Sequence, residues 1–365
     1  MYIPSPEGPL LHSRIVEKSK PFLLPEAIRG RQRGDERFGD IMRAFMLSIA
    51  AVGAAFFGCC AAFAATAGDS PPSWAFVIFQ DPGKTPPPQQ LVGVPGSRLK
   101  VTEKQLDDPF DPPDWFPGDH PGMPVVVAHG SPPKVWACSY CHLQTGVGGP
   151  DSAVLAGLPA AYIEQQLAEF RAGRRQCAVA KDIACSKAMP FEVARLSPSD
   201  LKAAAVYYSG LRYRSRIHVV EAAMVPKIYT DTYFLAAAAG DAREPIGERI
   251  LELPDPAVLQ EDGDWRGSIT AYVPPGSLAR GKALVTKGTG TDPCAVCHGA
   301  KLQGDGTLVP PLAGRSPSYL YRQLYDIQYG FRRGRAVEEM EPQVAHLTAK
   351  DRLAIAAYLA SLPGS

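Results

Sequence analysis

The chain has 365 residues, of which 45% are hydrophobic and 21% are charged, so a largely disordered chain is excluded and two or three domains are expected. Its formal net charge is only +1, which gives no electrostatic case for nucleic acid or for another partner of one sign. The 36 prolines and 34 glycines indicate long irregular segments around compact helical units.

The amino end is predicted to be an export region. Residues 1–41 form a polar lead that is unusually long for a signal peptide, which makes Met42 an alternative start, and residues 42–67 form a signal peptide or membrane anchor. Three interpretations remain open: a signal peptide cleaved near Ala67, an uncleaved anchor, and a lipoprotein signal ending at Cys59. In each, residue 68 onward lies outside the cytoplasm. We expect a soluble periplasmic protein after cleavage or, as the alternative, a protein held at the inner membrane through residues 44–67.

Residues 68–122 form a proline-rich extension with short apolar pieces at 74–79 and 91–94. We expect this extension to pack on the first domain of the chain, with its aromatic residues serving as packing rather than as a ligand site.

Two short motifs predict the cofactor. Residues 138–142 read Cys-Ser-Tyr-Cys-His, and residues 294–298 read Cys-Ala-Val-Cys-His. In this pattern two cysteines form thioethers to a porphyrin, and the adjacent histidine becomes the proximal iron ligand. Zinc half-sites or redox dithiols are the alternative, but a histidine directly after both dithiols favours haem. We therefore predict two covalently bound haem c groups, with the cysteines Cys138, Cys141, Cys294 and Cys297 and the axial histidines His142 and His298.

An internal duplication follows the two motifs. A Leu-Ala-Gly turn is followed by Tyr, Gln-Leu, Gly and Arg in both copies, and helical spacing of apolar residues predicts an amphipathic helix after each turn. Further along, Ser197 and Thr348 each precede an acid by three residues, which predicts capped helices ending near Leu211 and Leu362. We call residues 123–213 the first repeat and residues 274–365 the second repeat.

A methionine occupies the same place in both repeats, because Met189 and Met340 each fall seven residues before a matched leucine. Thioether sulfur is a soft, neutral donor, and a His/Met pair raises the reduction potential of haem iron. We therefore predict both methionines as axial ligands. The rival donors are not duplicated; they are Met123, Met224, His120, His129, His218 and His346.

Several residues have a predicted supporting role. Pro150 and Pro310 follow the haem histidines, and their carbonyl groups would accept a hydrogen bond from the imidazole, although a plain turn is the alternative. Arg175 and Arg332 are candidates for contact with haem propionates, or else solvated charges at a helix end.

The loop that holds Met189 is six residues longer than its counterpart and contains Cys177 and Cys185. In an oxidising compartment a disulfide between them is expected, with free thiols or a haem ligand as alternatives.

These motifs resemble two tandem class I c-type cytochrome domains, and they are most similar to the dihaem cytochrome c4 group. The resemblance implies a small helical fold around each haem, His/Met ligation and electron transfer outside the cytoplasm. The fold class is thus mainly α, with two tandem domains at 123–213 and 274–365, the proline-rich extension, and an insert at 214–273. The extension and the insert depart from the family pattern, as does Glu341 after Met340, where Pro190 follows Met189.

The insert has two strand-like pieces, at 217–222 and 249–253, which pair across the domains as a small sheet or simply drape over them.

The sequence favours an electron carrier. With each iron closed by histidine and methionine, no coordination site is open to a substrate, so the protein would pass single electrons between a dehydrogenase or quinol-oxidising complex and a terminal acceptor. Its partners would be redox proteins. A dihaem enzyme, such as a peroxidase or a thiosulfate-oxidising enzyme with a cysteine ligand, is one alternative. A haem subunit docked to a dehydrogenase or oxidase is another.

Overall fold

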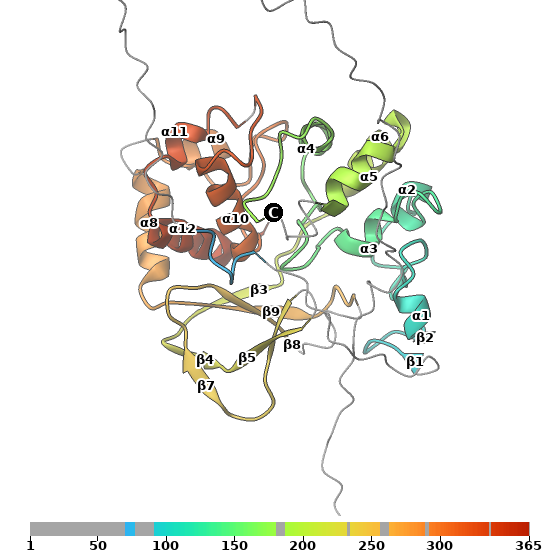
Figure 1. Ribbon diagram of the computed structural model, residues 1–365, viewed down its shortest axis with the longest axis horizontal. Helices are drawn as coiled ribbons and strands as arrows, with labels where there is room; N and C mark the ends of the chain where they lie inside the picture. The colour runs from blue at the N-terminus through green and yellow to red at the C-terminus, as the bar shows by residue number, and fades with distance from the viewer. Residues whose placement is uncertain are drawn as a thin grey trace, which may run out of the picture. The chain divides into compact units, whose positions relative to one another are not determined.

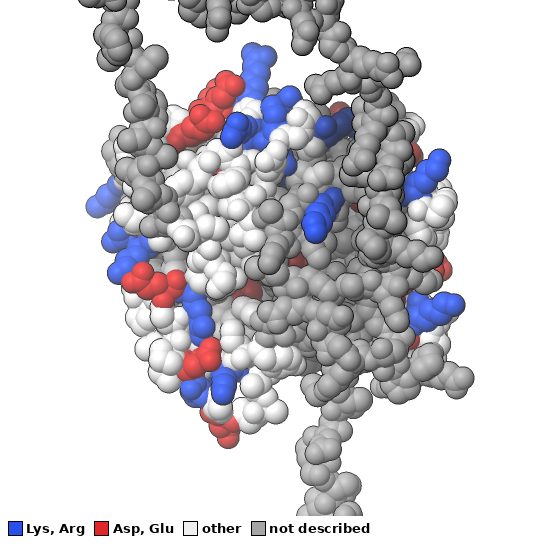
Figure 2. All heavy atoms as spheres, viewed as in Figure 1, with Lys and Arg blue, Asp and Glu red and all other residues white. Residues whose placement is uncertain are grey.

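The computed structural model describes residues 70–76, 91–179, 187–231, 234–255, 263–288, 292–335 and 337–364 (Figure 1). All of them belong to one compact unit. The predictions for residues 1–67 lie outside the described residues. Within the described ranges, every helix is too short or too polar to cross a bilayer. Acidic and basic side chains are interspersed on the described part of the face in Figure 2.

The first repeat contains five helices among its described residues. They are α2 (Val125–Ala128), α3 (Cys138–His142), α4 (Ala160–Arg171), α5 (Met189–Arg195) and α6 (Pro198–Ser209). The Ser197 side chain accepts a hydrogen bond from the backbone N–H of Asp200, which caps α6 as predicted.

The second repeat follows the same order with α8 (Ser277–Lys287), α9 (Ala295–His298), α10 (Pro317–Gln328), α11 (Glu341–Val344) and α12 (Ala349–Ser361). Thr348 and Asp351 form a full capping box at the start of α12. Helices α8 and α12 cross at Gly281, where a Cβ atom would lie 1.9 Å from the carbonyl oxygen of Ala354. The described part of the first repeat has only the four-residue α2 in the place of α8.

The described residues of both repeats are helical as expected, but those of the insert hold seven strands where the sequence indicated two. They are β3 (Ile217–Glu221), β4 (Met224–Pro226), β5 (Ile228–Asp231), β6 (Phe234–Ala237), β7 (Arg243–Pro245), β8 (Leu251–Asp255) and β9 (Ser268–Val273). Strand β9 lies between β3, which is parallel to it, and β8, which is antiparallel. Antiparallel pairs β4–β7 and β5–β6 complete the insert, and β3 contacts α12 (Figure 1).

The two predicted strands of the insert exist, but each pairs with β9 and not with the other. Sequence inspection missed β9, although its side chains alternate between half-buried and buried, with Ile269, Ala271 and Val273 buried. This alternation of apolar and polar residues with a period of two is typical of a strand and could have predicted β9 from the sequence.

The extension contacts both repeats. Its strands β1 (Leu91–Val92) and β2 (Val101–Thr102) pair, α1 (Glu103–Leu106) follows, and residues 92–116 build an apolar cluster against the first repeat. Residues 70–76 instead reach the second repeat, where Phe76 is fully buried and Trp74 packs on Tyr321 with ring centroids 4.6 Å apart. The expectation that the whole extension packs on the first domain is therefore wrong for residues 70–76, because the aromatic face of α10 accepts them.

Candidate haem-binding sites

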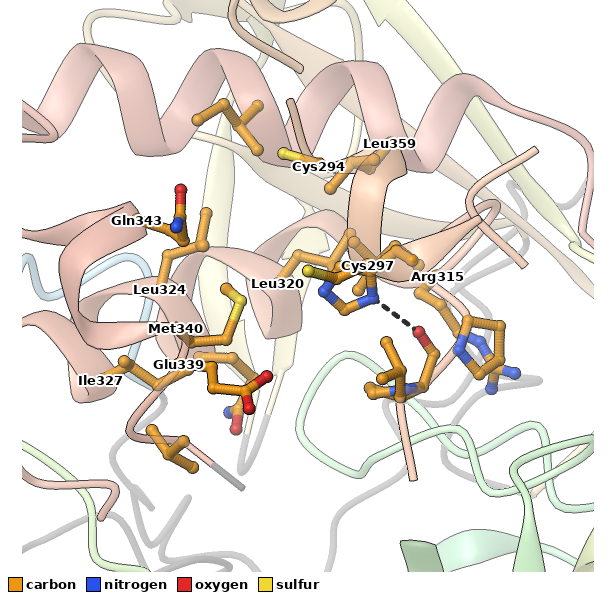
Figure 3. Close-up of a pocket in the computed structure, with 18 of the residues that line it drawn as sticks. Cys294, Cys297, Arg315, Leu320, Leu324, Ile327, Glu339, Met340, Gln343 and Leu359 are labelled. Carbon is orange, nitrogen blue, oxygen red and sulfur yellow. Dashed lines mark hydrogen bonds between the residues drawn. The ribbon is translucent and has the colours of Figure 1, made fainter. Parts of the chain in front are cut away.

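A largely apolar cavity lies at the Cys-x-x-Cys-His motif of each repeat. The first cavity is lined by Cys138, Cys141, His142 and Met189, and the second by Cys294, Cys297, His298 and Met340. Figure 3 shows Met340 and Cys297 reaching into the second cavity past Leu320 and Leu324. The four predicted donors of each set are thus brought to one cavity in each repeat. None of the six rival donors lines either cavity.

A tight turn ends the helix of each motif directly after the histidine. Leu143 has φ of 61° and Gly299 has φ of 80°, both in the left-handed region. The chain then folds back, so that Gly148 and Gly304 donate backbone hydrogen bonds to the carbonyls of His142 and His298. Left-handed backbone at a leucine is costly and is typically kept where a side chain must be held in place.

Both imidazoles are oriented by a backbone carbonyl. The Nδ1 atom of His298 donates to the Pro310 oxygen over 2.9 Å, as predicted, whereas Nδ1 of His142 donates to Ala153 over 2.9 Å and not to Pro150. Ala153 and Pro310 both stand two residues before a Leu-Ala-Gly turn. The carbonyl that accepts from the histidine ring is therefore set by its position in the repeat, and it does not have to belong to a proline. The Pro150 carbonyl accepts from Arg322 instead.

This bond leaves Nε2 of each ring unprotonated and available to a metal. Burial lowers the pKa of both His142 and His298, which favours the neutral imidazole that a metal ligand requires.

The methionines begin corresponding helices. Met189 is the first residue of α5, and Met340 directly precedes α11. Each is followed within two residues by a proline, which fixes the start of the helix and so the direction of the preceding chain.

Arg175 and Arg332 are buried, with exposed fractions of 9% and 8%, so the solvated alternative is wrong. Arg175 donates to Gln166 in its own repeat and to Tyr319 and Gln323 in the other, over 3.0, 3.0 and 3.3 Å.

Arg332 mirrors this arrangement, donating to Gln323 of its own repeat and to Tyr162 and Gln166 of the first, over 2.8, 2.9 and 2.9 Å. The two arginines also form an antiparallel backbone bridge. Burial alone would raise the pKa of the Tyr319 hydroxyl, but the charges of Arg175 and Arg332 hold it below its ordinary value.

Four arginines line the cavities: Arg175 and Arg322 in the first, Arg315 and Arg332 in the second. None of them forms an ion pair with a carboxylate of the described residues, and the buried Nε atoms of Arg315 and Arg332 have no hydrogen-bond partner there. Burying a cation without a carboxylate in direct contact is costly, so these arginines favour an anionic ligand in each cavity. The propionates of haem meet that need, and the apolar walls suit its porphyrin.

Sequence inspection missed Arg315 and Arg322. The equivalent residues of the first repeat are Leu158 and Gln165, so aligning the repeats does not mark Arg315 and Arg322 as functional residues.

The described cysteines fall into two groups, those with a free thiol and one in a disulfide bond. The four motif cysteines form no disulfide, whereas Cys177, which lines the first cavity, is disulfide-bonded. Cys185 lies outside the described residues, so its pairing with Cys177 stays a prediction. Within the described ranges, no group of three or more His, Cys, Asp or Glu side chains gathers in a way that could hold a metal ion.

Comparisons with known proteins agree with this chemistry. Residues 278–363 match the cytochrome c family model. The chain is 28% identical over 235 residues to a thiosulfate dehydrogenase electron acceptor of Thiomonas intermedia (strain K12), covering 64% of this chain and 82% of that protein. A protein of the same description from Stutzerimonas stutzeri (strain A1501) is 26% identical over 244 residues, covering 66% and 86%.

A shorter stretch of 70 residues is 39% identical to cytochrome c4 of Thiocapsa roseopersicina, covering 19% of this chain and 34% of that protein. The haem motifs, the match to the family model and this similarity agree. Residues 278–363 form a cytochrome c domain, and the chain is similar to the class I c-type cytochromes, cytochrome c4 among them.

Proposed function

We propose that this chain is a dihaem electron carrier in which each repeat binds one haem c. The tethers are Cys138, Cys141, Cys294 and Cys297, and the axial pairs are His142 with Met189 and His298 with Met340. The observation that supports this most directly is the presence of the same four donor types in both cavities.

The cofactor supplies reversible one-electron chemistry when bound. The histidines would hold the iron, with their rings fixed by the carbonyls of Ala153 and Pro310. The methionines would supply a second, soft ligand that favours the reduced state. Apolar wall residues such as Leu320 and Leu324 exclude water, and the buried arginines neutralise the propionates. With both faces of each iron closed, the residues support electron exchange rather than substrate binding.

The proposed donor is a dehydrogenase of the thiosulfate-oxidising type, because two relatives that this chain largely covers are described as electron acceptors of thiosulfate dehydrogenase. The electron would pass on to a terminal acceptor. The proposed location is the periplasm, with anchoring through residues 44–67 as the alternative.

The enzyme alternative needs an open or cysteine-ligated iron. Cys177 and Cys185 were the candidates for such a ligand, and the sulfur of Cys177 is engaged in a disulfide and offers no thiolate. This bond supports the carrier over the enzyme.

Two measurements test the proposal. The pyridine haemochrome spectrum should give two haem c groups per chain, and the reduced protein should not bind carbon monoxide. Met189→Ala and Met340→Ala should each remove half of the thioether-to-iron absorption and open one iron to carbon monoxide. Met224→Ala, at an exposed methionine on β4, is the matched control and should change neither signal. One haem per chain, or rapid carbon monoxide binding by the unaltered protein, would refute the closed dihaem carrier.

A further inference from the structure

The segments that carry the two methionines differ in surface charge. Three positions beside the methionine, at the spacing that relates the repeats, hold Lys187, Ala188 and Pro190 in the first repeat. In the second repeat the same positions hold three exposed carboxylates, Glu338, Glu339 and Glu341. Lys187 is exposed as well. The surface charge is therefore positive beside Met189 and negative beside Met340.

The first of these surfaces is basic around an apolar centre, and we call it the α5 face. It comprises four exposed residues, Lys134, Lys187, Phe191 and Arg195. Phe191 is 47% exposed, and the guanidinium of Arg195 lies over its ring, 3.5 Å from the centroid. A hydrogen bond of 2.9 Å from the backbone N–H of Trp136 to Glu192 joins the segment of Lys134 to α5. Glu192 is the only acid of α5 and is half-buried, so basic groups dominate the exposed side.

The second surface is acidic, and we call it the α11 face. It comprises four exposed residues, Glu338, Glu339, Glu341 and Leu308. Leu308 is 45% exposed and lines the second cavity together with Glu339. None of the three glutamates forms an ion pair with another described residue. The nearest exposed base before them in the described chain is Arg335, so the α11 face keeps a net negative charge.

The two faces lie on different sides of the described fold. Figure 1 shows α11 at the upper left and α5 at the upper right, with α4 between them. A second copy of the chain can therefore present its acidic face to the basic face of the first. The formal net charge of +1 sets up no general repulsion between copies.

We propose that the α5 face of one copy docks on the α11 face of a second copy, so that the protein associates head to tail. Opposite charges steer the two faces together, and Phe191 and Leu308 supply apolar contact area in the centre. Because the two faces differ, the contact is heterologous and can add further copies in the same direction.

This contact goes beyond the proposed carrier function. Residues of α5 line the first cavity, and residues of α11 line the second. Docking would thus place the first cavity of one copy beside the second cavity of the next. On the proposed dihaem function, an electron that crosses this contact oxidises the iron of one copy and reduces that of the other.

Sedimentation velocity of the haem-loaded full chain tests the association. At an ionic strength of about 0.01 M the protein should sediment as species larger than one chain, and at about 1 M as single chains, because the Debye length falls from roughly 30 Å to 3 Å. Single chains at both ionic strengths would overturn the proposal and leave the faces to other partners. Association that does not weaken with salt would overturn it as well.

Two charge-reversed variants test the direction of docking. Lys134→Glu with Lys187→Glu alters the α5 face, and Glu338→Lys with Glu341→Lys alters the α11 face. Each variant alone should associate at least roughly tenfold more weakly, because like charges then meet. An equimolar mixture should restore pairs, since each variant keeps the face that the other has lost. Lys227→Glu, at an exposed position of the insert, is the matched control and should associate as the unaltered protein does.

A mixture that stays apart would refute the head-to-tail arrangement. If a double variant does not fold, the single changes Lys187→Glu and Glu338→Lys decide in the same way. Covalent haem content, measured on each sample, separates the two ideas. Fewer than two haems in a protein that still associates would overturn the proposed function and leave the contact intact.

Discussion

A buried carboxylate of the insert holds the amino end of helix α10, and its removal should destabilise the second repeat. Glu252 on β8 is 4% exposed and accepts hydrogen bonds from the Ser316 hydroxyl over 2.8 Å and from the N–H and hydroxyl of Ser318 over 2.7 and 2.5 Å. These donors lie at the first turn of α10, where the helix dipole also favours an anion. The insert therefore anchors a helix that forms one wall of the second haem cavity.

The magnitude follows from the contacts that are lost. Each hydrogen bond to a charged group contributes about 1.5–3 kcal/mol, and the bonds are not additive. Loss of the carboxylate leaves several buried donors unpaired at about 1–3 kcal/mol each, or about 3–5 kcal/mol together. Glu252→Ala should therefore lower the free energy of unfolding by that amount, which is a large share of the roughly 5–15 kcal/mol typical of a folded protein. Glu252→Gln keeps one acceptor oxygen and should lose less.

Chemical denaturation followed by far-ultraviolet circular dichroism measures the loss. Glu248 offers a matched control, because it pairs with Lys350 of the second repeat over 2.7 Å but is 64% exposed. Its replacement by alanine should cost at most about 1 kcal/mol. If Glu252→Ala proves as stable as Glu248→Ala, the buried cap is not a significant anchor and the reasoning fails.

Three further predictions concern the contacts between helices and repeats. Gly281→Ala should lower the free energy of unfolding by about 1–3 kcal/mol, measured by thermal denaturation, because the new Cβ would meet the Ala354 carbonyl at 1.9 Å. Burial alone would raise the pKa of Asp351, but hydrogen bonds from Thr348 and Arg280 hold it below its ordinary value. The stability this gives is present above the ordinary pKa and is lost as pH falls through the lowered one, so urea unfolding of Asp351→Asn should depend less on acidification. Arg175→Gln should loosen the contact between the repeats and raise proteolysis at their junction, because Tyr319 loses its donor.

Two of these predictions have a control variant, and the third has an outcome that would contradict it. Gly118→Ala adds a methyl group with nothing within 4 Å and should leave the melting temperature unchanged. Arg174→Gln removes an exposed neighbour of Arg175 and should leave proteolysis unchanged. Equal acid sensitivity of Asp351→Asn and the unaltered protein would contradict the pKa argument.

The sequence predicted the donor sets because each donor is tied to a residue type and occurs twice. A thioether needs cysteine and a soft axial ligand needs methionine, so Met189 and Met340 stand out once the repeats are aligned. Their arrival in the two cavities with the histidines agrees with that reasoning. The capped starts of α6 and α12 were likewise predictable, because capping is a local property of a few neighbouring residues.

Contacts through the backbone or over long distances were not predictable in the same way. The acceptor for His142 is the carbonyl of Ala153, and every residue type has a carbonyl. The pairing of β3 and β8 with β9 joins segments up to about 50 residues apart. Phe76 shows the same difficulty, because an isolated aromatic residue in a proline-rich segment does not indicate which repeat it will meet.

Neither cavity is completed by its own repeat. The first takes Tyr319, Arg322 and Gln323 from the second repeat, and the second takes Val154, Tyr162 and Gln166 from the first. A single repeat on its own would therefore leave a wall of its cavity open to water.

Hydrogen bonds of two cavity arginines also make each cavity depend on both repeats. Arg322 of the second repeat lines the first cavity and donates to the carbonyl of Pro150 in the first repeat, as well as to that of Ala75 in the extension. Arg315 lines the second cavity and donates to the carbonyls of Val154 and Ala156 in the first repeat. Because each guanidinium is held by a carbonyl on the far side of the junction, a shift of one repeat would move a charge at the wall of a candidate haem cavity. The geometry of the junction and the electrostatics of both sites are thus one property of the fold.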